Sequence, residues 1–290
     1  LLLFRLSSVY RKSAPLLAFC VAVFWFILPI HVSTVMYPVQ RMAQLSALFV
    51  LLGLVSYAHG RVLVGPASYW KGLVFVFASF FVFLPLGLLS KENAILLVPL
   101  MFLLEVIIRR SSDSNWNQRF LAGWGVIFLL GLLVLIGLSE DIFEYINAEH
   151  RVVSPYLAFL TQTRIIFSYL REMVFPSNSR FGYFHDDITA SQNLFDPFET
   201  FYSVIGVIGL LAFSALWLWK SRSLVAFGIL FFFVGHTLES TILPLEFYFE
   251  HRNYLPSVGV VIGLISVGYW IGDKFKIQPL MGLLLVGFIS

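Results

Sequence analysis

Long apolar runs recur along the chain, each about 15 to 22 residues in length and bounded by charges or by Gly and Pro. An α-helix needs roughly 20 apolar residues to cross the ~30 Å hydrocarbon core of a bilayer. The runs therefore predict an all-α integral membrane protein, a polytopic bundle of about nine transmembrane helices. The predicted spans lie near 15–33, 42–59, 71–89, 94–109, 120–138, 201–219, 224–240 and 255–272, with a last one from about 279.

The composition excludes a soluble globular domain. Of the 290 residues, 59% are hydrophobic and 12% are charged, whereas a soluble domain carries roughly 25% charged residues. The net charge of +3 comes without a basic stripe interleaved with aromatic residues, so no nucleic-acid partner is predicted. Cys20 is the only cysteine and can form no internal disulfide.

We expect residues 1–290 to form a single transmembrane domain that is truncated at both ends. The chain begins at Leu1 rather than at Met, and it ends at Ser290 within an apolar run. No small-residue cleavage site follows the first apolar run, so no signal peptide is predicted.

The distribution of Lys and Arg predicts which side of the membrane each loop faces. Twelve of the 19 Lys and Arg residues fall in alternate short loops, which we expect to be cytoplasmic: 1–14, 60–71, 109–119, 220–223 and 273–278. The segment 139–200 then becomes a large external loop. Within it, 156–175 carries Arg164, Arg171 and Glu172 among aromatic residues, and this composition predicts an interfacial or re-entrant helix.

Four polar clusters lie at the predicted outer ends of spans, and each has a structural as well as a functional interpretation. The clusters are 31–41, 90–93, 185–187 and 236–256. Lys91 and Glu92 could pair with each other at a tight corner, and Arg41 could anchor its helix in the interface. His236 and Glu239, one helical turn apart, could form half of a metal site or an inter-helix hydrogen bond.

The cluster of His185, Asp186 and Asp187 is expected to be a solvated loop or, alternatively, part of an acceptor or metal site. No cluster has the ligand spacing of a metal centre. No cofactor is therefore predicted, and a divalent metal is left open.

Taken together, the outer clusters have the chemistry of a site for a polyprenyl-phosphate sugar. Three cations, Arg41, Lys91 and Arg252, share one predicted face and could bind a phosphate at headgroup depth. Nearby carboxylates could order those cations or bind sugar hydroxyls: Glu92, Glu239 and Glu250. An apolar groove between helices would hold the hydrocarbon tail.

The order of these motifs resembles the membrane portion of GT-C glycosyltransferases that are coupled to tetratricopeptide repeats. The resemblance lies in 38–43 (PVQRMA) following His31, in 89–93 (LSKEN) and in 250–259 (EHRNYLPSVG). The family includes the transmembrane and tetratricopeptide repeat O-mannosyltransferases of eukaryotes and their bacterial relatives. The wording FEHRNYLPS is closer to the bacterial members.

The resemblance implies transfer of one sugar from a polyprenyl-phosphate donor to a protein or glycan acceptor on the non-cytoplasmic face. The membrane would be a bacterial inner membrane, or the endoplasmic reticulum in a eukaryote. The catalytic acid is expected upstream of Leu1, and the repeats beyond Ser290. Arg252 and Lys91 would bind the donor phosphate, with Arg41 at the rim. The residues expected to order the site are Glu92, Asn93, Glu250, His251, Asn253, Tyr254, His31, His236 and Glu239.

Three other functions are compatible with a polytopic helical protein. An O-antigen ligase or polymerase would favour a large external loop rich in Arg and His, but 139–200 is predominantly acidic. A transporter or flippase would place ionisable residues near the middle of the bilayer in two repeated halves, and neither feature is visible in the sequence. A catalytically inert fragment is the third.

Overall fold

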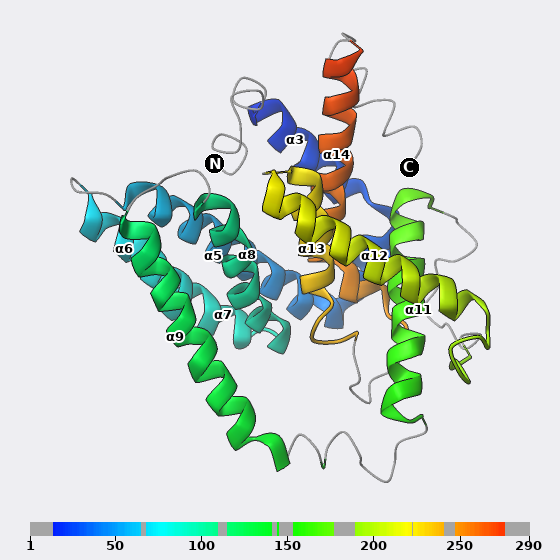
Figure 1. Ribbon diagram of the computed structural model, residues 1–290. Coiled ribbons are helices and arrows are strands. Elements are labelled where there is room, and N and C mark those ends of the chain that lie inside the picture. Colours follow the sequence, from blue (N-terminus) through cyan, green and yellow to red (C-terminus); the bar gives the residue numbers. More distant parts are fainter. Residues whose placement is uncertain are drawn as a thin grey trace.

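The computed structural model describes residues 14–64, 68–109, 115–140, 144, 153–176, 189–221, 223–240 and 247–275. Within these ranges every regular element is a helix (Figure 1), as the sequence predicts. Four helices are long and apolar enough to cross a membrane, or five if one bent pair counts as a span. The nine predicted spans are not confirmed, and the expected span from 279 lies outside the described residues.

The first predicted span, 15–33, is broken into two helical pieces. Helix α3 (Ala14–Ile27) ends just before Pro29. The next piece, 29–36, is formed by the 3₁₀ turn η1 (Pro29–His31) and α4 (Val32–Met36), and it lies at 54° to α3. Proline has no N–H to donate and its ring clashes with the preceding turn, so the bend falls where Pro29 enters the apolar run.

The next two spans pack against each other through glycines. After the turn η2 (Pro38–Gln40), helix α5 covers Arg41–Leu63, and the following span consists of α6 (Tyr69–Ala78), the π-helical turn η3 (Ser79–Phe83) and α7 (Leu84–Leu88). A Cβ added to Gly60 would lie 2.6 Å from the carbonyl oxygen of Gly72, so only glycine permits this approach of α5 and α6.

The next two helices have opposite surroundings. The 3₁₀ turn η4 (Glu92–Leu96) leads into α8 (Leu97–Arg109), whose Leu97, Leu100 and Met101 are fully buried at the centre of the largest apolar cluster. Helix α9 (Asn115–Gly137) packs through Trp124 but leaves almost all its other apolar side chains exposed. In Figure 1, α9 accordingly runs along the edge of the molecule.

The remaining described helices form the second half of the bundle. They are α11 (Pro155–Val174), α12 (Glu199–Lys220), α13 (Leu224–Gly235), the 3₁₀ turn η6 (Glu250–Asn253) and α14 (Ser257–Lys274). The predicted span 224–240 is shorter than expected, because α13 ends at Gly235 after 12 residues. A helix occupies the segment 156–175 as expected, and ten of its residues are buried within the protein.

Helices α13 and α14 are in backbone contact. A Cβ on Gly228 would lie 2.3 Å from the carbonyl oxygen of Gly259, and a Cβ on Gly259 would lie 2.4 Å from that of Gly228. Just beyond this contact, a Cβ on Gly235 would lie 2.7 Å from Cγ of Pro256. We call this contact of Gly228, Gly235, Pro256 and Gly259 the glycine seam. It sets the end of α13 against the segment that follows η6, within the predicted polar cluster 236–256.

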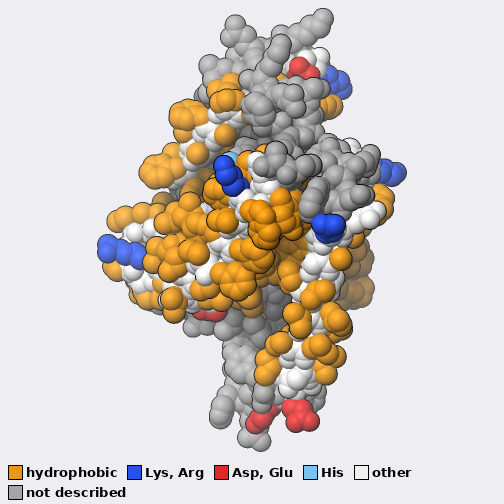
Figure 2. Space-filling view, turned by 90° about the vertical axis from the view of Figure 1, so that its left-hand side faces the viewer, with side chains coloured by type: hydrophobic (Ala, Val, Ile, Leu, Met, Phe, Trp, Pro, Cys, Tyr) orange, Lys and Arg blue, Asp and Glu red, His pale blue; other side chains and the backbone are white. Residues whose placement is uncertain are grey.

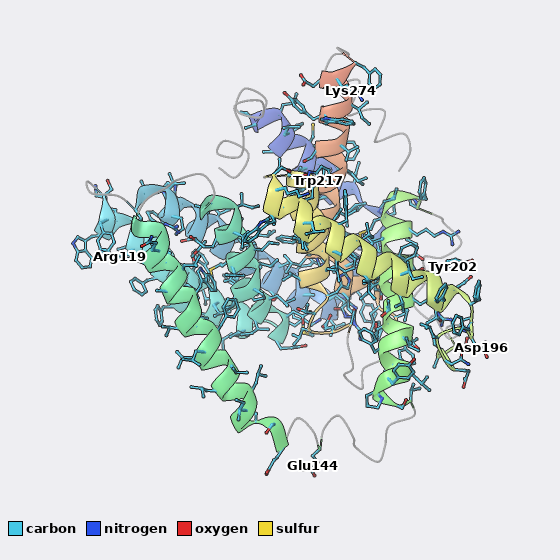
Figure 3. All side chains as sticks on the ribbon, in the orientation of Figure 1. Arg119, Glu144, Asp196, Tyr202, Trp217 and Lys274 are labelled. Atoms are coloured by element: carbon cyan, nitrogen blue, oxygen red, sulfur yellow. The ribbon has the colours of Figure 1, made fainter. Side chains whose placement is uncertain are left out.

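Acidic side chains lie at the lower end of the molecule in these views. In Figure 3, Lys274 lies at the top and Arg119 at about half height on the left, while Asp196 and Glu144 lie in the lower part. The space-filling view in Figure 2 shows a broad apolar surface, with acidic side chains at the lower tip.

A buried ion pair joins Arg61 of α5 to Glu105 of α8, with both nitrogen–oxygen distances at 2.6 Å. Sequence analysis assigned Arg61 to a loop, but it lies inside α5.

Candidate functional site

Three charged side chains from separate elements meet near the N-terminal end of α5. Lys91 Nζ lies 2.7 Å from Oε1 of Glu239, and Arg252 Nε lies 3.7 Å from the other oxygen, Oε2. All three side chains are largely buried, with exposed fractions of 10%, 12% and 5% for Lys91, Glu239 and Arg252. We call these three residues the charge cluster. Sequence analysis predicted that all three share one face.

Local backbone geometry brings each member of the charge cluster to this point. Lys91 is extended, with φ −160° and ψ 144°, at the tight corner before η4. Glu239 lies in the turn that follows α13, and Arg252 lies in η6, just before α14. The glycine seam holds the last two segments together, so Glu239 and Arg252 meet although 13 positions separate them.

Two buried polar atoms beside the charge cluster lack hydrogen-bond partners among the described residues. One is Nε of Arg252, because the 3.7 Å separation from Glu239 is too long for a hydrogen bond. The Nη1 group of Arg252 donates to the Phe247 carbonyl at 3.2 Å, and the guanidinium lies 5.2 Å from the Phe249 ring centre. The other atom is Oδ1 of Asn93, whose amide group hydrogen-bonds to the Glu239 carboxylate.

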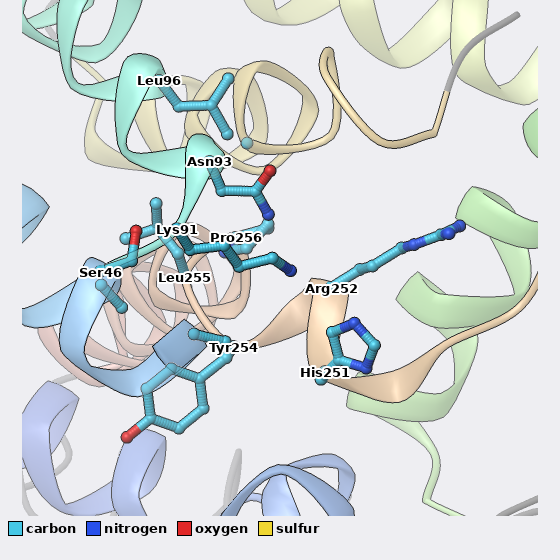
Figure 4. Close-up of a pocket in the computed structure, with 12 residues that line it drawn as sticks. Ser46, Lys91, Asn93, Leu96, His251, Arg252, Tyr254, Leu255 and Pro256 are labelled. Atoms are coloured by element: carbon cyan, nitrogen blue, oxygen red, sulfur yellow. The ribbon is translucent and has the colours of Figure 1, made fainter. Parts of the chain in front are cut away.

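Asn93 and Arg252 both line a small pocket. Figure 4 shows Lys91 pointing toward Arg252 and His251, with Asn93 above and Tyr254 below. Its accessible volume is about 20 Å³, which is enough for one water-sized group. The remaining wall is formed by small and apolar residues of α5, of η4, of the end of α13 and of the turn before α14: Ala43, Ser46, Ala47, Leu96, Gly235, Leu255 and Pro256.

The electrostatics of the pocket are dominated by the two cations. Burial alone would raise the pKa of the Glu239 carboxyl, but Lys91, Asn93 and Arg252 together lower it below its ordinary value. Burial, reinforced by the positive charges of Lys91 and Arg252, lowers the pKa of His251 to about 4. Near neutral pH, His251 is therefore an uncharged imidazole beside two cations and one carboxylate.

An aromatic cage holds the first helical piece against the charge cluster. The indole N–H of Trp25 donates to the Tyr254 carbonyl and to the Ser257 hydroxyl, both at 3.0 Å. Nε2 of His31 lies 2.8 Å from the same hydroxyl, which itself donates to Tyr254 O at 3.0 Å. Since Ser257 Oγ has three partners, it serves as a fixed junction rather than as a nucleophile. Sequence analysis included His31 and Tyr254 but missed Trp25 and Ser257.

His236 forms the inter-helix hydrogen bond that was one of its two predicted roles. Its Nε2 lies 3.2 Å from Oδ1 of Asn253, and its Nδ1 lies 2.9 Å from the Phe232 carbonyl oxygen. Among the described residues, no three His, Cys, Asp or Glu side chains are grouped so that they could hold a metal ion. The geometry in this part of the chain therefore favours the structural interpretation of His236.

Helix α11 fixes the strand-like segment that leads into η6. The hydroxyl of Tyr169 donates to the Phe249 carbonyl at 3.0 Å and accepts from the Phe249 N–H at 2.8 Å. The hydroxyl of Tyr248 donates to the buried carboxylate of Glu172 at 2.5 Å, and Gln162 donates to the Phe247 carbonyl. Sequence analysis missed these roles. The sequence did contain an indication of these roles, because Gln162, Tyr169 and Glu172 are polar residues spaced seven and three positions apart along one helix.

Several predicted site residues lie elsewhere. Arg41 and Glu92 are exposed and do not line the pocket. Glu92 is the first residue of η4, and its neighbours Lys91 and Asn93 line the pocket although Glu92 does not. Glu250 is buried in η6 next to the pocket wall. His185, Asp186 and Asp187 lie outside the described residues.

Comparisons with protein-family models, with curated proteins and with solved structures found no match to this chain. In the part of the chain that the structure describes, fold and site define a helical protein with four or five apolar helices that could cross a membrane. At one end of this bundle, a buried Lys–Arg pair meets the carboxylate of Glu239.

Proposed function

We propose that the protein is a membrane glycosyltransferase that takes its sugar from a polyprenyl-phosphate donor. The observation that carries this proposal is the buried cationic pair of Lys91 and Arg252, which lines a pocket with an unpartnered Arg252 Nε. A buried guanidinium N–H without an acceptor is costly, and a phosphate oxygen would satisfy it with a charge-assisted hydrogen bond.

The second unpartnered atom favours a ligand that also carries hydroxyl groups. Asn93 uses its amide N–H to reach the Glu239 carboxylate, so its buried Oδ1 remains available as an acceptor. A sugar attached to the phosphate would bring hydroxyl donors within reach of this atom. The hydrocarbon tail would lie along the exposed apolar side chains of α5 and α7, such as Leu45, Leu48 and Leu88.

The motif order and the charge distribution support the same proposal. The stretches around Lys91 and Arg252 resemble GT-C glycosyltransferases, and those two residues belong to the charge cluster. We place the cluster on the non-cytoplasmic face of a bacterial inner membrane, or of the endoplasmic reticulum in a eukaryote. The acceptor would be a protein or a glycan. We assign donor binding, and not acid–base catalysis, to the charge cluster.

The test is sugar release from a labelled polyprenyl-phosphate donor by membranes that contain the full-length protein. Lys91→Gln and Arg252→Gln should each reduce release by about 100-fold, because each removes a charge-assisted contact to the phosphate. Lys220→Gln is the matched control, since it neutralises an exposed cation at the far end of α12, and release should stay within about twofold. Normal sugar release by both cluster variants would mean that Lys91 and Arg252 have a structural role and do not bind the donor.

A further inference from the structure

Glu239 already takes the position that an anionic ligand would need. Its carboxylate contacts Lys91 at 2.7 Å and lies 3.7 Å from Arg252 Nε. Lys91 is adjacent in sequence to a second carboxylate, Glu92, but its ion pair is with Glu239. The charge cluster is therefore closed internally: Lys91 is paired at hydrogen-bond distance, whereas Arg252 Nε is not.

We propose that Glu239 is a resident anion, which a phosphate group must displace from Lys91 in order to bind to Lys91 and Arg252 together. This inference rests on the proposed function, because it describes how the same site admits its phosphate. A phosphate oxygen within hydrogen-bond distance of both Lys91 Nζ and Arg252 Nε would lie against the Glu239 carboxylate, and the two negative charges would repel each other.

The surroundings of Glu239 allow such a displacement. Glu239 lies in a turn after α13 rather than within a helix, and its side chain is 12% exposed. A hydrogen bond from Asn93 is its remaining described polar contact, and that amide could follow the carboxylate or turn to the ligand. The competition would make the site selective among anions. A small anion that offers one contact cannot replace Glu239, whereas a phosphate held by two cations and by its attached groups can.

The experiment measures phosphate binding to the detergent-solubilised protein, with inorganic phosphate in one arm and geranyl phosphate in the other. Glu239→Gln keeps the shape of the side chain and removes its charge, so affinity should rise by about tenfold. Glu92→Gln removes the same charge from the exposed residue next to Lys91 and should change affinity by less than about twofold. Tighter binding of geranyl phosphate than of inorganic phosphate identifies a lipid headgroup as the ligand.

A double variant separates direct competition from a general effect of charge. In the Lys91→Gln background, Glu239→Gln should raise affinity by less than about threefold, because the contact for which the two anions compete is gone. If Glu239→Gln does not fold, Glu239→Asp replaces it. This variant withdraws the carboxylate from Lys91 by one methylene, and an intermediate gain in affinity is expected.

Two outcomes would overturn the inference. Unchanged or weaker binding in Glu239→Gln would mean that Glu239 positions the cations instead of competing for them. If Lys91→Gln and Arg252→Gln still weaken binding in that case, the proposed donor site survives. If no variant bound inorganic phosphate or geranyl phosphate, the proposed competition and the proposed donor site would both be contradicted.

Discussion

Two buried ion pairs lie at opposite ends of α5, and they differ in how completely their hydrogen bonds are satisfied. Glu105 accepts two hydrogen bonds from Arg61 and a third from the Tyr57 hydroxyl at 2.7 Å. The Trp124 indole in turn donates to that hydroxyl, and the Arg61 guanidinium lies 3.7 Å from the Phe120 ring centre. Among the described residues, the charge cluster leaves Arg252 Nε without an acceptor. The first pair therefore has the geometry of a structural element, and the second is the one that we propose as a binding site.

Glu105→Gln should destabilise the protein because it leaves the Arg61 charge buried without its counter-charge. The expected loss in the free energy of unfolding is about 3–5 kcal/mol. Thermal unfolding in detergent measures it, with Glu140→Gln as the control, since Glu140 is an exposed carboxylate. The double variant R61M/E105M should recover much of the loss. Equal stability of Glu105→Gln and the control would contradict a structural role for this pair.

His251 should make the fold sensitive to acid. Its pKa is about 4 in the folded protein, below its ordinary value of 6.5, because burial and the charges of Lys91 and Arg252 outweigh the attraction of Glu239. Between these pH values the unfolded chain binds a proton that the folded chain does not. The stabilising contribution is therefore complete above about pH 6.5 and is lost as the pH falls toward 4.

The measurement is the midpoint of thermal unfolding at about pH 7.5 and at about pH 5. The midpoint of the parent protein should fall more on acidification than that of His251→Gln, which has no imidazole to protonate at this position. Equal falls in the two proteins would show that other groups determine the acid sensitivity.

How well the site could be predicted depended on how far apart in the sequence its contacting residues lie. Lys91 and Arg252 were identified because they share one predicted face and lie in two of the motifs that resemble GT-C glycosyltransferases. Glu92 was included because it is adjacent to Lys91, but it is exposed and does not line the pocket. Glu239 was predicted on the same face, but its pairing with Lys91 was not, because 148 positions separate them and the packing of α13 against α8 brings them together.

At the scale of elements, the glycine seam determines how closely the two halves of the site approach. Gly259→Val should push α13 and α14 apart, because its first side-chain carbon would lie 2.4 Å from the Gly228 carbonyl oxygen. We expect a loss of at least about 1–3 kcal/mol in the free energy of unfolding, together with weaker phosphate binding.

The matched control is Gly209→Val in α12, where an added Cβ would meet nothing within 4 Å. Valine has a better intrinsic helix propensity than glycine, so this variant should be as stable as the parent. Thermal unfolding and phosphate titration of both variants test the seam. Weaker phosphate binding by Gly209→Val would mean that the effect does not depend on the contact between α13 and α14.

The sequence predicted where apolar helices occur better than where they end. The spans 42–59, 71–89 and 201–219 correspond to helices of 20 or more residues. The spans 15–33 and 224–240 were extended past Pro29 and Gly235, because apolar composition alone does not register a bend or a turn inside an apolar run. The backbone contact of Gly235 with Pro256 could not be read from either residue alone.

At the scale of the whole molecule, orientation in the membrane is the property that most directly tests the proposed function. Cys20 is the only cysteine, and it is buried, so Cys20→Ala gives a background for single-cysteine labelling. Glu92→Cys should react with a membrane-impermeant maleimide in intact cells, and Lys220→Cys should react only after permeabilisation. The reverse pattern would place the charge cluster in the cytoplasm and contradict an external transferase site.

The exposed position of α9 has a consequence for the range of bilayer thickness in which the protein can reside. Its span, Gln118–Gly137, is 20 residues long, which corresponds to about 30 Å. Side chains from 129 to 138 are exposed, and the helix packs on the bundle through Trp124. In a bilayer of different thickness α9 can therefore tilt about its packed end. The pocket is lined by α5, the corner and turn at 91–96, the end of α13 and the segment 251–256, and not by α9. Such a tilt would therefore leave its geometry unchanged, and the site should work in membranes of unequal thickness.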